Sequence, residues 1–134
     1  MNANELRIGN LVYYRNEDYK AVLIAEDLIK IDIGYGAVQR FEKNPIFSPN
    51  IDELKPIPLT EEWLLKFGFD KVGEWMGIDF NPRMGMRFYN GNAAECDITQ
   101  DDKYIAFKCG FIQYVHQLQN LYFALTGNEL ELKP

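Results

Sequence analysis

The segment from Cys109 to Asn128 contains no acidic residue and no Lys or Arg. Because 25% of the whole chain is charged, a helix with one face in solvent would be expected to carry several charged side chains over this length. The segment carries Gln, Asn and His instead. Amide and imidazole groups cost less to desolvate than ions, so we expect the segment to be covered on more than one side. The cover comes either from the rest of the fold or from another chain.

The composition is that of an acidic globular protein. The 134 residues, 47% of them hydrophobic, are enough for one domain or for two small lobes that share a core. The net charge of -6 disfavours non-specific binding to nucleic acids, which depends on Lys and Arg neutralising phosphates. No run approaches the roughly 20 apolar residues of a membrane span, and the N-terminus lacks the pattern of a secretory signal. We therefore expect a cytoplasmic protein with reduced cysteines and no membrane contact.

Residues 1–58 predict a small antiparallel β lobe. Short runs of β-branched and aromatic residues are separated by turn residues, which is typical of strands joined by tight turns. The isoleucines that follow residue 28 alternate with polar residues, so we expect them on one buried face. Several short strands of this kind suit either a small curled sheet or an SH3-like barrel. The expected strands are 11–14, 21–25, 29–33 and 37–41, with the first turn at Asn16, Glu17 and Asp18.

A short helix is predicted to begin after the proline-rich residues 44–58. Thr60 can cap its N-terminus, where the helix dipole favours Glu61 and Glu62. Gly68 is expected to end the helix, because glycine adopts the left-handed conformation that closes many helices. The apolar stripe of this helix, which we expect to pack on a sheet, consists of Trp63, Leu64 and Phe67.

Residues 59–134 predict a second lobe, in which a C-terminal helix closes an antiparallel meander. We therefore expect an α+β protein, divided at residue 58 into two lobes that share one core. The C-terminal helix is expected from about Tyr114 to Thr126, with Gly127 as its cap, and Leu130 and Leu132 can add a last short strand. The meander strands are expected at 71–80, 86–89, 93–98 and 104–109, with turns at Asn90-Gly91 and at Gln100, Asp101 and Asp102.

The residue types that usually carry catalysis or bind metals form no recognisable pattern. His116 is the only histidine, and a catalytic role for it would need a carboxylate beside it in a cleft. Cys96 and Cys109 are expected near each other across a hairpin, as unreactive thiols rather than as a zinc site. We predict no metal and no cofactor, and we expect a noncatalytic protein more than an enzyme. Four carboxylates could in principle bind a divalent cation, but they lack the regular ligand spacing of a calcium loop. They are Asp79, Asp97, Asp101 and Asp102.

Two groups of residues are candidates for contact with a partner. The first is the uncharged side of the C-terminal helix, which would contact another protein or a second copy of the chain. The second is a place where cations and aromatic residues alternate, as they do at sites that stack on single-stranded bases. An ordinary strand with an outward Arg and an inward Phe gives the same pattern. The protein-interface residues are His116, Gln119, Asn120 and Phe123, and the alternative nucleic-acid-binding residues are Arg83, Arg87, Phe88 and Tyr89.

Three stretches resemble a family of small uncharacterised proteins from Bacteroides-type bacteria, their phages and mobile elements. They are residues 6–10 (LRIGN), 55–69 (KPIPLTEEWLLKFGF) and 114–127 (YVHQLQNLYFALTG). No function is established for that family, so the resemblance implies only a setting, that of a small cytoplasmic accessory protein of phage or mobile-element origin. We expect a noncatalytic accessory protein that contacts a protein partner or itself through the C-terminal helix. The alternatives are a nucleic-acid-binding accessory factor and an enzyme with a site around His116.

Overall fold

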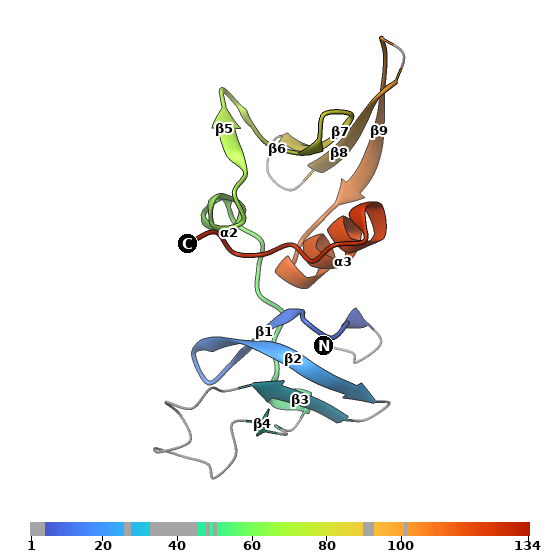
Figure 1. Ribbon diagram of the computed structural model, residues 1–134. Coiled ribbons are helices and arrows are strands. Elements are labelled where there is room, and N and C mark those ends of the chain that lie inside the picture. Colours follow the sequence, from blue (N-terminus) through green and yellow to red (C-terminus); the bar gives the residue numbers. More distant parts are fainter. Residues whose placement is uncertain are drawn as a thin grey trace.

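The computed structural model contains two antiparallel sheets with two helices between them (Figure 1). It describes residues 5–25, 28–32, 46–47, 49, 51–89, 93–100 and 102–134. The two small sheets and the C-terminal helix confirm the α+β class. Within these ranges, no helix is long and apolar enough to cross a membrane.

The first sheet contains four strands in chain order, each antiparallel to the next. Its first hairpin turns at Arg15 and Asn16, whose φ angles are 47° and 70°, so that Tyr14 pairs with Glu17. The predicted turn was therefore misplaced, because Glu17 and Asp18 already belong to the second strand. The predicted strand at 37–41 and the side chains of residues 29–33 lie outside the described residues, and the SH3-like barrel stays a prediction. The strands are β1 (Leu11–Tyr14), β2 (Glu17–Ala25), β3 (Leu28–Asp32) and β4 (Ile46–Phe47).

The second sheet is a five-stranded meander, again in chain order. The single strand predicted at 71–80 is two strands, because the chain turns at Gly73, where φ is +61°, and Val72 pairs with Trp75. At the far end of the sheet, Gln100 pairs with Lys103, which places the last turn as predicted. The turn predicted at Asn90-Gly91 lies outside the described residues. The strands are β5 (Asp70–Val72), β6 (Trp75–Asn81), β7 (Met84–Tyr89), β8 (Ala93–Gln100) and β9 (Lys103–Phe111).

Helix α2 (Glu61–Lys66) follows a short 3-10 turn, η2 (Ile51–Glu53), and has the predicted caps. The Thr60 hydroxyl accepts a hydrogen bond from the Trp63 amide at 3.4 Å. At the other end Gly68 has φ +88°, and the Phe69 amide donates to the Leu64 carbonyl at 3.0 Å. This bond folds the chain back over the last turn, as in a Schellman motif.

Helix α3 (Val115–Thr126) is the charge-free helix, and it ends at Gly127 with φ +73°, as predicted. At its start, the Gln117 side-chain oxygen accepts bonds from the amides of Gln113 and Tyr114, at 2.9 and 3.1 Å. These bonds satisfy backbone donors that have no partner inside the helix.

Residues 55–59 connect the first sheet to α3. The Lys55 amide and carbonyl exchange two 3.0 Å hydrogen bonds with Tyr13 on β1. Two residues later, the Ile57 carbonyl accepts from the Val115 amide at 2.9 Å, at the first turn of α3. The segment therefore pairs with β1 on one side and with the start of α3 on the other, as a strand would. Each of these pairings is one residue long.

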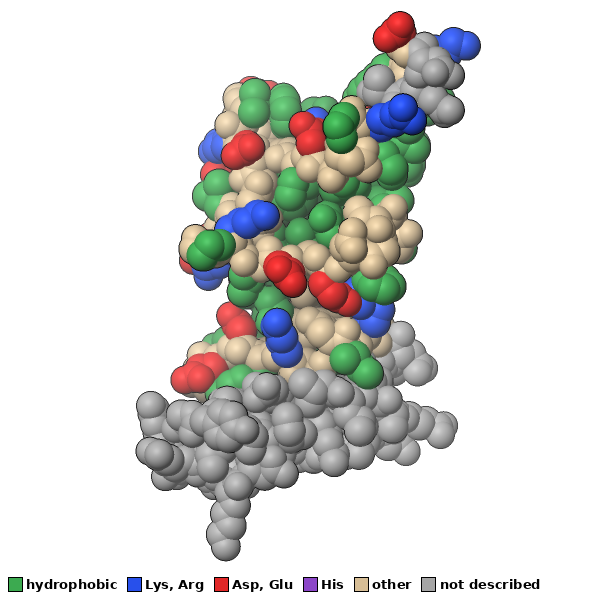
Figure 2. Space-filling model, in the orientation of Figure 1, with side chains coloured by type: hydrophobic (Ala, Val, Ile, Leu, Met, Phe, Trp, Pro, Cys, Tyr) green, Lys and Arg blue, Asp and Glu red, His purple; other side chains and the backbone are tan. Residues whose placement is uncertain are grey.

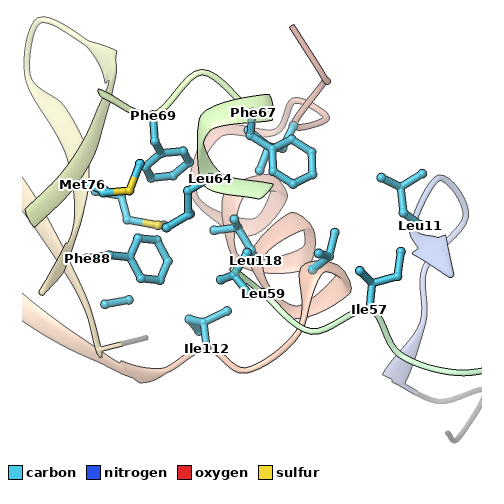
Figure 3. Packing of buried hydrophobic residues seen from close by; sticks show 14 of the residues in the cluster. Leu11, Ile57, Leu59, Leu64, Phe67, Phe69, Met76, Phe88, Ile112 and Leu118 are labelled. Carbon is cyan, nitrogen blue, oxygen red and sulfur yellow. The ribbon is translucent and has the colours of Figure 1, made fainter. Parts of the chain in front are cut away.

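The core lies between the second sheet and the two helices. Figure 3 shows Leu64, Phe69, Met76 and Phe88 pointing toward one another, and the Phe69 and Phe88 rings meet edge to face at 5.7 Å. Leu11 of the first sheet belongs to the same cluster, so both predicted lobes contribute to one core. The other buried members are Ile57, Leu59, Phe67, Met86, Ala94, Cys96, Ile112, Val115, Leu118 and Leu130.

The C-terminal residues pack beside α2 without forming a strand. Leu130 is buried, whereas Leu132 is 46% exposed. The Lys133 amide donates to the Lys66 carbonyl at 2.7 Å. The short strand predicted from Leu130 and Leu132 is therefore wrong, because the tail follows the end of a helix rather than the edge of a sheet.

Removing the Phe67 ring should destabilise the fold strongly, since Phe67 is fully buried and ends the apolar stripe of α2. We expect Phe67→Ala to lower the free energy of unfolding by about 3–5 kcal/mol. The matched control is Leu65→Ala on the same helix, where the side chain is 50% exposed and the loss should stay near 0.5 kcal/mol. Urea unfolding at neutral pH measures both. Equal losses for the two variants would contradict the packing of α2.

Candidate functional site

The uncharged side of α3 is covered by residues 5–11 of the same chain. The Gln119 side-chain oxygen accepts a hydrogen bond from the Leu11 amide at 2.9 Å, and its nitrogen donates to the Gly9 carbonyl at 3.4 Å. The next residue of the helix, Asn120, donates from its side chain to the Glu5 carbonyl at 3.0 Å. Side-chain amides suit this role because each offers a donor and an acceptor without a charge.

Arg7 brings a cation to the covered helix from outside it. Its guanidinium carbon lies 4.0 Å from the centre of the Phe123 ring. Its two terminal nitrogens bind the Glu129 carboxylate at 2.5 and 3.1 Å, just beyond the end of the helix. The fork geometry of Arg and carboxylate fixes the orientation of both side chains.

The turn before β1 holds this segment in place. Gly9 has φ +95°, a conformation that side-chain-bearing residues rarely adopt. The Asn10 side chain, which is fully buried, accepts a bond from the Arg7 amide at 2.7 Å. The Gly9 amide and the Asn10 carbonyl then pair with Ala21 on β2, at 2.7 and 2.8 Å. The residue pattern did not identify Arg7, Asn10 and Glu129 as contacts of α3, although residues 6–10 form one of the three resemblance stretches.

His116 is closed to solvent, with 1% of its surface exposed. Its Nε2 lies 3.8 Å from a carboxylate oxygen of Glu5, and its ring stacks on Tyr114 at 5.8 Å. Burial lowers the pKa of His116 below its usual value, while the nearby Glu5 carboxylate opposes this shift. The enzyme alternative required a carboxylate beside His116 in a cleft. The carboxylate is present, but the imidazole is covered.

The four predicted protein-interface residues differ in their exposure to solvent. His116 and Gln119 are buried, and Asn120 is half-buried by the N-terminal segment. Phe123 is 38% exposed, beneath the Arg7 guanidinium. The fold itself therefore supplies the cover that the missing charge predicted, and Phe123 is the member of this group that a partner could reach.

The four predicted nucleic-acid-binding residues also differ in their exposure to solvent. Phe88 is 2% exposed and belongs to the core, whereas Tyr89 is 36% exposed. Arg87 lies against the outer side of the sheet, where it donates to Asp79 at 2.6 Å and to the Ile78 carbonyl at 2.9 Å. Its charge is thus balanced inside the protein, and Arg83 is left as the exposed cation of the group.

Gly77 and Gly85 make room for Arg87. A Cβ atom at Gly77 would lie 2.5 Å from the Arg87 side chain, and one at Gly85 would lie 2.7 Å from it. A hollow of about 250 Å³ adjoins this place, with Asp79 and Asp97 in its wall as well as the two Arg side chains. The surface is mixed in charge, which does not match the basic groove of a nucleic-acid-binding protein.

A second hollow, of about 370 Å³, lies between the N-terminal turn and the C-terminal tail. Its wall includes Gly9, Leu11, Lys20 and Gln119, and residues 129–132 close the other side. His116 lines neither hollow.

Strand β9 carries a group of exposed hydrophobic side chains that sequence reasoning missed. The exposed fractions are 62% for Tyr104, 60% for Ile105, 40% for Phe107 and 74% for Phe111. β9 ends the sheet, since β8 is its neighbour on one side and no described strand pairs with it on the other. The signal in the sequence was the run Tyr104–Phe107, which lacks the polar alternation of a half-covered strand.

Ile105 and Phe107 continue the core-facing side of the sheet beyond the helices. Phe107 pairs with Cys96 and Ile105 pairs with Ile98, so each shares a face with its partner. Cys96 is buried, which identifies this as the core side. Figure 2 shows hydrophobic side chains at the surface between the β5–β9 sheet and α3.

Comparison of the chain with protein-family models, curated proteins and solved structures finds no match. The resemblance to the Bacteroides-type family stays a prediction, and we therefore infer function from the geometry of the chain itself.

Loss of the Gln119 amide should destabilise the junction between α3 and the N-terminal segment. Gln119→Ala leaves the buried Leu11 amide without its acceptor, so we expect a loss of about 2 kcal/mol in the free energy of unfolding. Gln113→Ala is the control within the same uncharged stretch, because the Gln113 side chain is exposed. Hydrogen exchange should show faster exchange at Leu11 in the first variant alone. Unchanged protection of that amide would contradict the assigned bond.

Acidification should destabilise the protein through His116. Because the folded state lowers the pKa of His116, the unfolded chain binds more protons below its pKa of 6.5. Stability is therefore fully present above pH 6.5 and falls as the pH decreases, by up to about 1.4 kcal/mol per pH unit. Urea midpoints at pH 7.5, 6.5 and 5.5 measure this slope. His116→Gln should flatten it, and parallel slopes for the two proteins would refute the assignment.

Proposed function

We propose that this chain is a noncatalytic interaction protein that associates with a second copy of itself through strand β9. The observation that carries the proposal is the exposure of Tyr104, Ile105, Phe107 and Phe111 on a strand at the end of its sheet. An edge strand presents unpaired backbone donors and acceptors, and large exposed apolar groups beside them favour pairing with another strand.

The charges of β9 do not select a strongly charged partner. The strand contains Lys103 and Lys108 and no acidic residue. Lys108 already stands opposite Glu95 in the register of β8, so its charge has a counterpart within the sheet. What the strand offers to a partner is therefore mainly apolar surface and backbone hydrogen bonds.

Antiparallel pairing of two β9 strands about a two-fold axis at Phe107 avoids repulsion between like charges. In this register Lys108 faces Ala106 of the other copy, and Lys103 faces Phe111. A shift of the register that placed Lys103 opposite Lys108 would be disfavoured, because like charges directly opposite each other destabilise a sheet. The preferred pairing extends the five-stranded sheet across both copies.

A noncatalytic role is supported by the environment of the residues that could catalyse a reaction. His116 is covered by the N-terminal segment, and Arg87 is bound by Asp79. Phe123 on α3 remains a second place where another chain could bind, as its 38% exposure allows.

Introducing a charge on β9 should dissociate the pair without unfolding the monomer. We expect wild-type protein to have the mass of a dimer at high micromolar concentration, and Ile105→Arg to have the mass of a monomer with an unchanged melting temperature. Leu132→Arg is the control, since Leu132 is a 46% exposed leucine away from β9. Size-exclusion chromatography with light scattering measures the mass.

Phe123→Glu separates the two candidate surfaces. If the contact is through β9, this variant should remain a dimer. A dimer that dissociates with Phe123→Glu and persists with Ile105→Arg would move the contact to α3. A monomeric wild-type protein at every concentration would refute self-association.

A further inference from the structure

Cys96 and Cys109 lie on paired strands, with their sulfur atoms 2.6 Å apart. Cys96 on β8 pairs with Phe107, so Cys109 is two residues beyond the paired position on the same face. Such diagonal neighbours are ordinarily about 7–8 Å apart between their α-carbons. The register shifts here, because Ala94 pairs with Gly110 and Glu95 pairs with Lys108. Cys109 is the extra residue of this bulge, and the bulge turns its side chain toward Cys96.

The two thiols differ in their access to solvent. Cys96 is 1% exposed, whereas Cys109 is partly exposed. Burial raises the pKa of the Cys96 thiol, and the neighbouring Cys109 and Asp97 raise it further. A reagent from solvent therefore reaches Cys109 first, and Cys96 can react only with a sulfur that is already beside it.

We propose that Cys96 and Cys109 form a reversible dithiol–disulfide site whose co-substrate is a small-molecule disulfide such as oxidised glutathione. Cys109 is the attacking residue and Cys96 is the resolving residue. This proposal does not rest on the proposed self-association, because the reaction requires one chain and a solute, although Cys109 lies on the same strand.

The reaction proceeds in two balanced steps. In the first, the Cys109 thiolate attacks one sulfur of the small disulfide, whose S–S bond breaks as the mixed disulfide forms and one small thiolate leaves. In the second, the Cys96 thiol loses its proton to that thiolate, and its sulfur attacks Cys109 Sγ and expels the second small thiol. The protein loses two protons and two electrons, and the small disulfide takes them up to become two thiols.

Closure of this bond would join β8 to β9 around their hairpin. The loop that it closes includes the turn between Gln100 and Lys103 and residues 103–108 of β9. A cross-link of this kind restricts the unfolded chain and stabilises the folded one. Oxidation should therefore raise the melting temperature, by roughly 10 °C for a loop and a chain of this size.

The test is incubation of the native protein with excess oxidised glutathione, followed by intact mass measurement. The wild type should lose the mass of two hydrogen atoms and retain no glutathione, and dithiothreitol should reverse the change. Cys96→Ser should instead hold one glutathione at Cys109, because no resolving thiol is present. Cys109→Ser should remain unmodified while folded and react once urea exposes Cys96.

Each alternative outcome would overturn the proposal. A wild type that does not react would mean that Cys109 is inaccessible, and a stable glutathione adduct on the wild type would mean that the two sulfurs do not meet. A disulfide between two chains on a non-reducing gel would exclude an internal site. If Cys96→Ser does not fold, Cys96→Ala takes its place. The number of thiols that react in the native wild-type protein provides the same comparison.

Discussion

The hydrogen bonds of the Gln119 side chain to residues 9 and 11 are the interaction on which the arrangement of the chain depends. They join the C-terminal helix to the start of the first sheet, across more than a hundred residues of sequence. Arg7 donates to the Gln119 carbonyl and Asn120 donates to the Glu5 carbonyl, which adds two bonds between the helix and the N-terminal segment. Because α3 also forms one wall of the core, the same helix holds the N-terminal segment and packs on the second sheet.

This double use of α3 explains why the helix lacks charge. One side packs in the core through Val115 and Leu118, and the other is covered by a segment whose backbone needs hydrogen-bond partners. An ion on that side would be desolvated without an adequate partner, whereas an amide satisfies a backbone donor and acceptor at low cost. The charge that the junction does use, on Arg7 and Glu129, lies at its rim where water remains available.

The second sheet is covered unevenly. The helices bury the core side of β6, β7 and β8 around Met76, Met86 and Cys96, but β9 extends beyond them. Ile105 and Phe107 on β9 continue the core side without a cover, and this supports the proposal that a second chain binds there. The cysteine pair lies at the boundary between the part of the sheet that the helices cover and the uncovered strand β9. One sulfur is therefore buried and the other is accessible.

Local chemistry in the sequence determined most of the secondary structure. Thr60, Gly68 and Gly127 act at helix ends through bonds within a few residues, so the helices could be predicted, as could most strands of the meander. The missing charge of α3 also predicted that both of its sides are covered. Only the tertiary structure decided that residues 5–11 provide the cover and that β9 is left exposed. These outcomes depend on contacts between distant segments and on where a sheet ends, which neither periodicity nor turn chemistry encodes.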